Sequence, residues 1–74
     1  MPSMKPHYTG SVAFDDHNDV WRDESVMAFD YEDFIKDMQS KMQRRRNSEV
    51  FFAAFIDKDG KENDITRRVQ ESCG

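Results

Sequence analysis

Carboxylates are concentrated in residues 15–37, where they could attract a positively charged partner. This segment holds nine Asp and Glu residues against Arg22 and Lys36, which gives it a net charge of −7. Residues after position 40 carry eight Lys and Arg against six Asp and Glu. A field of this kind speeds encounter with a basic surface but says nothing about the fold. The candidate contact residues are Asp15, Asp16, Asp19, Asp23, Glu24, Glu32, Asp33 and Asp37.

Two histidines and one turn segment have side chains that could ligate a metal. His7 and His17, with the carboxylates at positions 15, 16 and 19, fall in predicted loops, whereas zinc needs three or four ligands held by a rigid shell. The segment 57–60 begins like a calcium loop, but the later positions that require an oxygen ligand, a glycine and a glutamate hold other residues. The sequence therefore predicts no metal and no cofactor.

Side-chain patterns of known catalysts are missing from the sequence. It contains no G-x-S-x-G, no H-E-x-x-H and no glycine-rich phosphate loop. The one cysteine, Cys73, can form no internal disulfide and has no neighbour that would activate it. A fold of 74 residues also leaves little room for a pocket that shifts the pKa of a carboxyl group. We therefore expect a protein that is not an enzyme.

The cellular location is expected to be the cytoplasm, or the host cytoplasm if a phage or mobile element encodes the chain. A single cysteine fits a reducing compartment. No apolar run approaches the roughly 20 residues that a membrane span needs. The first ten residues, MPSMKPHYTG, lack the apolar region of a signal peptide.

Arginines in the second half could bind the phosphates of a nucleic acid. The candidates are Arg44, Arg45, Arg46, Arg67 and Arg68. The first three of these arginines also fall at the C-terminal end of a predicted helix, where positive charge commonly stabilises the helix dipole. The net charge of −4 and the pI of about 5.0 disfavour a nucleic-acid binder, which usually has a basic domain.

One helix is predicted over residues 31–46. Asp30 is a good N-cap, and Phe29 with Phe34 fits a hydrophobic staple. Acids follow in the first turn, and an apolar stripe recurs at helical spacing through Met42. Before this helix, residues 8–14 read as a strand, 15–19 as a turn and 20–29, less regularly, as strand.

After the helix, the apolar run 50–56 predicts a strand that is buried on both faces. A hairpin turn at 57–61, with Gly60 at positive φ, leads to a predicted strand at 65–69. Residues 1–7 read as an irregular lead-in and 70–74 as a frayed tail. The predicted fold is a single α+β domain over 1–74, of order β-β-α-β-β, with one helix packed on a largely antiparallel sheet.

Strict alternation divides the strand at 50–56 into two apolar faces. Phe51, Ala53 and Phe55 would share one face, and Val50, Phe52, Ala54 and Ile56 the other. One helix covers only one face of a sheet, so the second face needs another cover. We expect the N-terminal strand region with Trp21 to fold over it, and a homodimer or a partner is the alternative.

These features favour a small acidic binding protein that modulates or inhibits a larger protein machine, as accessory proteins of phages do. Its negative surface would dock on a basic site, for example one that normally holds nucleic acid, with Trp21 and Tyr31 as aromatic anchors. The simpler interpretation of the acids is a solvated face. Two competing hypotheses are a nucleic-acid-binding module that uses the arginines and a structural subunit of a larger assembly.

Overall fold

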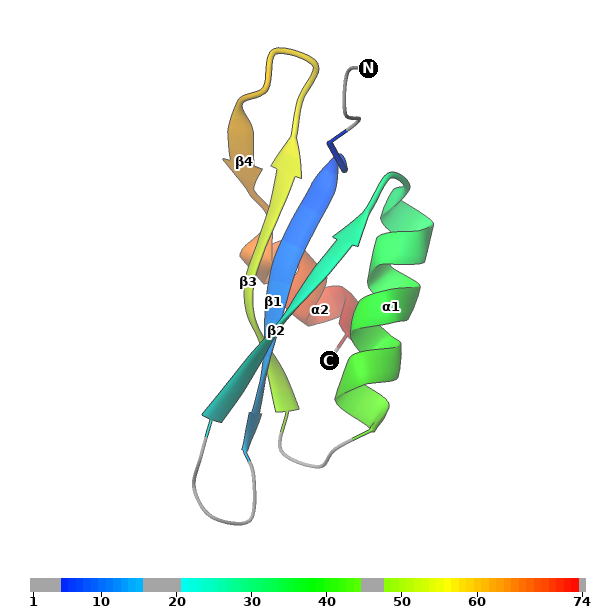
Figure 1. Cartoon of the computed structure of the whole chain (residues 1–74), viewed down its shortest axis with the longest axis vertical. Helices are drawn as coiled ribbons and strands as arrows, with labels where there is room; N and C mark the ends of the chain where they lie inside the picture. Colours follow the sequence, from blue (N-terminus) through cyan, green and yellow to red (C-terminus); the bar gives the residue numbers. More distant parts are fainter. Residues whose placement is uncertain (1–4, 16–20, 45–47, 74) are drawn as a thin grey trace.

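Four antiparallel strands in one sheet and two helices make up the fold (Figure 1). The computed structural model describes residues 5–15, 21–44 and 48–73. In chain order the elements are β1 (Tyr8–Asp15), β2 (Trp21–Ala28), α1 (Tyr31–Gln43), β3 (Ser48–Ile56), β4 (Glu62–Asp64) and α2 (Thr66–Cys73). The strand order in the sheet is β2-β1-β3-β4. The α+β class is confirmed, and the order β-β-α-β-β is matched, although the last strand is Glu62–Asp64 and a second helix follows it.

Helix α1 begins where the sequence predicts. The Asp30 side chain accepts a hydrogen bond from the Glu32 amide (3.4 Å), and acids occupy the first turn. Phe34 and Met38, four residues apart, are fully buried. The helix ends at Gln43 before its C-cap, Arg44, and the rest of the predicted span lies outside the described residues.

The prediction of a strand at 65–69 and a frayed tail at 70–74 is wrong for the described residues, because 66–73 form helix α2. The Asp64 carboxylate accepts a hydrogen bond from the Thr66 amide (2.9 Å) at the start of this helix. Ile65, Val69 and Cys73 pack on the core, and their spacing of four residues is helical. The alternation of apolar and polar residues over 65–69 is typical of a strand, and it led to the wrong prediction because the helical spacing extends beyond it to Cys73.

Helix α2 and the residue before it, Ile65, supply hydrogen bonds to β3 where β4 stops. Strand β4 pairs only with residues 54–56 of β3. Beyond that point the Ala53 amide donates to Thr66 Oγ1 (3.1 Å), and the Ala53 carbonyl accepts from the Ile65 amide (3.0 Å). Gln70 Nε2 donates to the Val50 carbonyl (3.1 Å). Backbone groups of β3 that lacked a partner here would destabilise the fold. A helix places Thr66 and Gln70 one turn apart on one face, so that both side chains can bond this edge of β3.

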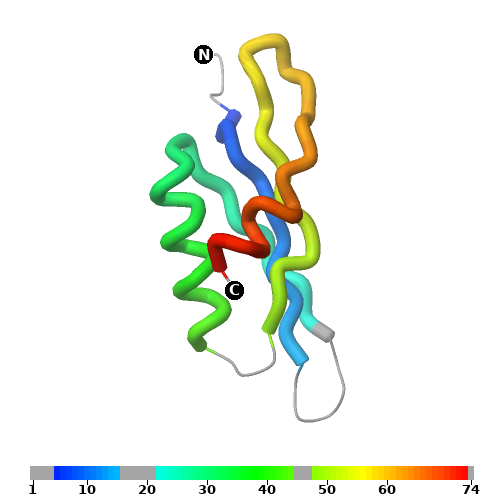
Figure 2. Tube along the Cα trace, turned by 180° about the vertical axis from the view of Figure 1, so that it is seen from behind, coloured from blue at the N-terminus to red at the C-terminus, as the bar shows by residue number. Residues whose placement is uncertain are grey.

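Both helices lie on the same face of the sheet, and α2 crosses it beside α1 (Figure 2). Between the helices, Gln39 Nε2 donates to the Ser72 carbonyl (3.3 Å). The core lies beneath them. It consists of Val12, Phe14, Val26, Ala28, Phe34, Met38, Val50, Ala53 and Val69, with Tyr8, Ile35, Met42, Ile65 and Cys73 packed against it.

A bulge in β3 changes which of its side chains share a face. Ser11 pairs with Phe52, but Val12 pairs with Val50, so Phe51 is an extra residue. Val50 therefore joins Ala53 in the core, while the Phe51 side chain is 67% exposed. The predicted alternation, which placed Val50 and Ala53 on opposite faces, is wrong because it allowed for no bulge.

The sheet surface opposite the helices is here called the uncovered face. The expected cover by the region around Trp21 is wrong, because β2 pairs with β1 as an edge strand of the same sheet. No helix or strand in the described ranges lies over this face. Met27 (62% exposed) and Phe51 are its exposed large apolar side chains. Homodimer formation through this face stays a prediction.

Two turn carboxylates make the stability depend on pH. Amide donors, chiefly Lys61, lower the pKa of Asp57, and the Thr66 hydroxyl and amide lower the pKa of Asp64. Each ionised carboxylate therefore stabilises the folded state above its ordinary pKa of 3.8, and this contribution is lost as the pH falls through the lowered folded value. We expect the urea midpoint to fall as the solution is acidified across this range.

The substitution Asp57→Asn keeps an acceptor oxygen but removes the titration, so it should lessen the acid-dependent fall of the urea midpoint. Asp59→Asn makes the same change of charge in the same turn and is the control. Equal pH profiles for the two variants would contradict the assignment of this effect to Asp57.

Candidate protein-binding surface

Aromatic side chains gather at the end of the molecule where β1 begins, β2 ends and α1 starts. Tyr8, the first residue of β1, pairs with Ala28 on one side and Phe55 on the other, and α1 begins three residues after Ala28. A hollow of about 490 Å³ lies here, called the aromatic hollow below. It is lined by His7, Tyr8, Phe29, Asp30, Tyr31, Phe55, Asp57 and Lys58.

The Tyr8 ring is the centre of this aromatic group. Its centroid lies 5.1 Å from that of Phe55, 5.4 Å from that of Tyr31 and 5.6 Å from that of Phe34. These separations are typical of favourable aromatic pairs. Because Phe34 is fully buried, the Tyr8 ring connects the wall of the aromatic hollow to the core. Packing of Tyr8 on the core therefore fixes the position of this wall.

Two aromatic residues singled out from the sequence line the hollow with different exposure. Tyr31, an expected anchor, is half-buried; its ring lies 5.6 Å below the Arg68 guanidinium and its hydroxyl is 3.5 Å from Ser72 Oγ. Phe29, expected to staple α1 through Phe34, is 55% exposed. Sequence reasoning did not select Phe29 as a contact residue, although its position directly before the N-cap of an acidic helix placed it beside the carboxylates.

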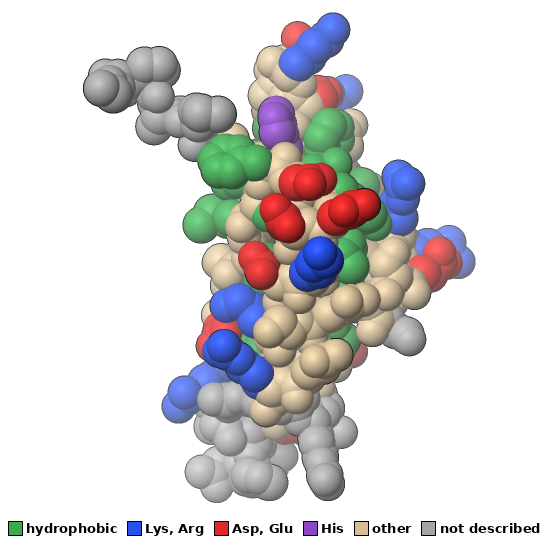
Figure 3. All heavy atoms as spheres, turned by 90° about the vertical axis from the view of Figure 1, so that its right-hand side faces the viewer, with side chains coloured by type: hydrophobic (Ala, Val, Ile, Leu, Met, Phe, Trp, Pro, Cys, Tyr) green, Lys and Arg blue, Asp and Glu red, His purple; other side chains and the backbone are tan. Residues whose placement is uncertain are grey.

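The acidic first half of α1 adjoins the aromatic hollow. Asp30, Glu32, Asp33 and Asp37 are all exposed, and the intervening Lys36 is the cation among them. Figure 3 shows carboxylates gathered on this side of the molecule next to hydrophobic side chains. Glu32, Asp33 and Asp37 are called the α1 carboxylates below. Structurally, acids in a first turn also stabilise the helix through its dipole.

The remaining acidic candidates that the structure describes, Asp15, Asp23 and Glu24, lie on β1 and β2 rather than on α1. Asp15 ends β1 seven residues after Tyr8, which at strand spacing is about 23 Å away. Asp23 pairs with Ala13 near that same end, and Glu24 forms an ion pair with Lys41 (3.0 Å). Asp15 and Asp23 therefore lie toward the end of the sheet opposite the aromatic hollow, whereas Glu24 lies beside α1, where Lys41 is one turn from Asp37.

Three more sequence candidates fall in or beside the loop between β1 and β2. Asp16 and Asp19 lie outside the described residues, as does His17. The backbone of Trp21, the expected aromatic anchor, belongs to β2, and its side chain is outside the described part of the chain.

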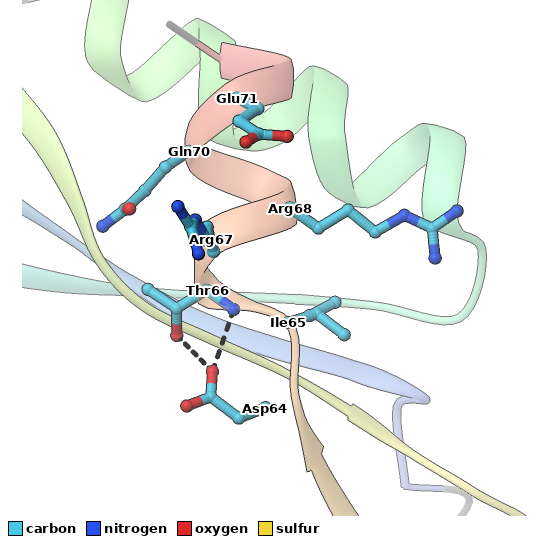
Figure 4. A pocket seen from close by; sticks show the side chains of 7 residues that line it. All are labelled: Asp64, Ile65, Thr66, Arg67, Arg68, Gln70 and Glu71. Carbon is cyan, nitrogen blue, oxygen red and sulfur yellow. Dashed lines mark hydrogen bonds between the residues drawn. The ribbon is translucent and has the colours of Figure 1, made fainter.

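The described arginines do not form one patch. Arg44 is the C-cap residue of α1, whereas Arg68 lies over Tyr31, the first residue of α1. Tyr31 is thirteen positions before Arg44, which corresponds to about 20 Å along the helix. Arg45 and Arg46 lie outside the described residues. Figure 4 shows Arg67 and Arg68 leaving α2 in different directions.

The arginines of α2 also share their surroundings with acids. A hollow of about 780 Å³ beside them includes Asp64 and Glu71 in its lining. Asp64 accepts hydrogen bonds from the Thr66 amide and hydroxyl there (Figure 4). This mixed charge makes a weaker site for phosphates than a basic patch would.

Residues considered for metal or nucleophilic chemistry are separated in the described part of the chain. No group of three or more His, Cys, Asp and Glu side chains within it is arranged to hold a metal ion. His7 is exposed, with Nδ1 3.4 Å from the Ile56 carbonyl oxygen. Burial raises the pKa of the Cys73 thiol, which lowers its thiolate fraction and its reactivity.

Comparison with protein families, with curated proteins and with solved structures gave no match to this chain. Neither described helix is long and apolar enough to cross a membrane.

Proposed function

We propose that this chain is a non-enzymatic binding protein that modulates or inhibits a larger protein machine by docking on a basic surface of it. The observation that carries the proposal is the combination at one end of the fold of the exposed α1 carboxylates with the exposed Phe29 and the aromatic hollow. Apolar anchors surrounded by charge are a usual composition for a protein interface.

The two parts of this surface have different roles in binding. The α1 carboxylates attract a basic surface over a distance, which mainly raises the association rate and makes it depend on salt. The aromatic side chains bury area once contact is made, which mainly slows dissociation. A site that normally holds nucleic acid has the required positive charge, so occupation of such a site would inhibit the machine that carries it.

Neutralising the α1 carboxylates tests the proposal. We expect the triple variant Glu32→Gln, Asp33→Asn, Asp37→Asn to lower the association rate with the captured partner about tenfold or more at low salt, and much less at high salt. The partner would be captured from a lysate of the native host after nuclease treatment, and rates measured by surface plasmon resonance. Circular dichroism would verify that α1 still forms.

A matched control removes the same number of carboxylates from the far end of the sheet. The triple variant Asp15→Asn, Asp23→Asn, Glu49→Gln changes the net charge equally and should retain most of the association rate. Equal loss in both variants would show that net charge alone matters and would contradict α1 as the docking surface. Capture that disappears after nuclease treatment would instead favour the arginines and a nucleic-acid partner.

A further inference from the structure

We infer that the aromatic hollow receives an arginine side chain of the basic partner. This inference rests on the proposed function and adds the chemical group that the site would recognise. The observations that carry it are the aromatic side chains that line the hollow, the Asp30 carboxylate in the same lining and a guanidinium already placed over one of the same rings.

The hollow has room for a cationic side chain, and its lining suits a cation. Ligand sites typically measure about 300–1,000 Å³, and the aromatic hollow, at about 490 Å³, lies in the lower part of this range. Tyr8, Phe29, Tyr31 and Phe55 contribute rings to its lining. The negative faces of such rings attract cations, and the flat guanidinium also stacks on them.

Asp30 gives the hollow a carboxylate for the incoming cation. It is exposed, and within the described ranges its side-chain hydrogen bond uses only Oδ1, at 3.4 Å from the Glu32 amide nitrogen. Oδ2 can therefore accept an N–H from a guanidinium. Asp57 adds negative charge, although both its oxygens accept hydrogen bonds within the turn 57–63. A charged carboxylate next to aromatic side chains selects a cation over an uncharged apolar side chain.

The chain itself contains an example of the proposed contact. The Arg68 guanidinium carbon lies 5.6 Å from the centroid of the Tyr31 ring, within the distance at which cations are attracted to rings. Tyr31 is also in the lining of the aromatic hollow. The planar guanidinium is thus already accepted by this aromatic group, which favours arginine over lysine for the partner.

Lys58 opposes the proposed ligand and supplies a test with the opposite sign. It is exposed in the turn 57–61 and lines the hollow, so its charge repels an incoming cation. The substitution Lys58→Ala should therefore strengthen arginine binding, whereas Phe29→Ala should weaken it. Phe51→Ala removes a phenylalanine of similar exposure from the uncovered face and is the matched control.

The experiment compares nona-arginine with nona-lysine, two peptides of equal charge, by titration calorimetry at low salt. We expect nona-arginine to bind about 2- to 5-fold more tightly, the effect of a cation–ring contact at an exposed site. Phe29→Ala should remove this preference, Lys58→Ala should strengthen nona-arginine binding about twofold or more, and Phe51→Ala should change neither. Amide shifts in NMR spectra should centre on the residues of the aromatic hollow.

The outcomes separate this inference from the proposed function. Equal affinities for the two peptides, unchanged by Phe29→Ala but reduced by neutralising the α1 carboxylates, would overturn the arginine site and leave the docking surface intact. Absence of binding to either peptide would overturn both. Shifts of the same hollow residues on raising the protein concentration without peptide would show a second copy as the occupant, and would also overturn the inference.

Discussion

Replacing Phe34 with alanine is expected to unfold most of the protein at room temperature. Phe34 is fully buried between α1 and the sheet, and removing a buried phenylalanine side chain costs about 3–5 kcal/mol. A core in a domain of this size rarely supplies more than about 3–5 kcal/mol in total. The substitution therefore removes most or all of the free energy of unfolding.

The measurement for Phe34→Ala is urea denaturation followed by far-UV circular dichroism. Phe51→Ala is the control, because its side chain is 67% exposed and its loss should change the free energy of unfolding by no more than about 0.5 kcal/mol. A cooperative transition at the wild-type midpoint in Phe34→Ala would contradict the assignment of Phe34 to the core.

Replacing Gly10 with valine is expected to destabilise the fold by about 3 kcal/mol, at the upper end of the usual cost of overpacking. A Cβ atom at this position would meet Met38 Cε, lie 2.9 Å from Phe34 Cζ and lie 2.9 Å from the Phe52 carbonyl oxygen. The methionine end can move aside, but the carbonyl belongs to the backbone of β3. A side chain at Gly10 would therefore force α1 away from the sheet or distort β3.

Thermal and urea unfolding would measure the Gly10→Val effect against Ser11→Val. Ser11 is the next residue of β1 and is paired with Phe52 on the uncovered face, so the same side chain should be tolerated there within about 0.5 kcal/mol. Similar stabilities for the two variants would show that the contact of α1 with β1 is looser than the structure indicates.

The aromatic hollow and the core share one ring, which links stability to the proposed binding. Tyr8 lies in the lining of the hollow and stacks on Phe34 at 5.6 Å. A substitution in the core therefore alters the hollow as well. For this reason the binding tests use the exposed Phe29, Lys58 and α1 carboxylates, whose loss leaves the core side chains in place.

Local sequence signals predicted three elements well. The N-cap Asp30 and the apolar stripe through Phe34 and Met38 lie within a few residues of one another, so α1 could be located without knowledge of its neighbours. The strands β1 and β3 are likewise indicated by composition, and Gly60 has the positive φ (80°) that its turn suggested. The special role of Gly10 was not predictable, because it depends on a helix that begins about 20 residues later.

The candidate site was predictable only in its charge. The sequence indicated the acids of residues 15–37, but the division of most of them between α1 and the far end of the sheet follows from the pairing of β1 with β2. Phe29 and Phe55 meet Tyr8 at one hollow because β1 lies between β2 and β3, a placement that no local pattern contains. The arginines were likewise separated by the length of α1.

By itself the sequence determined the α+β class, the position of α1, two central strands and the negative charge, because each arises from neighbouring residues or from composition. Only the tertiary structure decided that 66–73 are helical, that Phe51 is extra in β3 and that one face of the sheet is uncovered in the described ranges. The physical reason is that these features satisfy backbone hydrogen bonds and bury side chains between segments distant in the chain. The side chains of Thr66 and Gln70 form hydrogen bonds with the backbone of β3 beyond the end of β4. These backbone groups need such partners only once the sheet has formed.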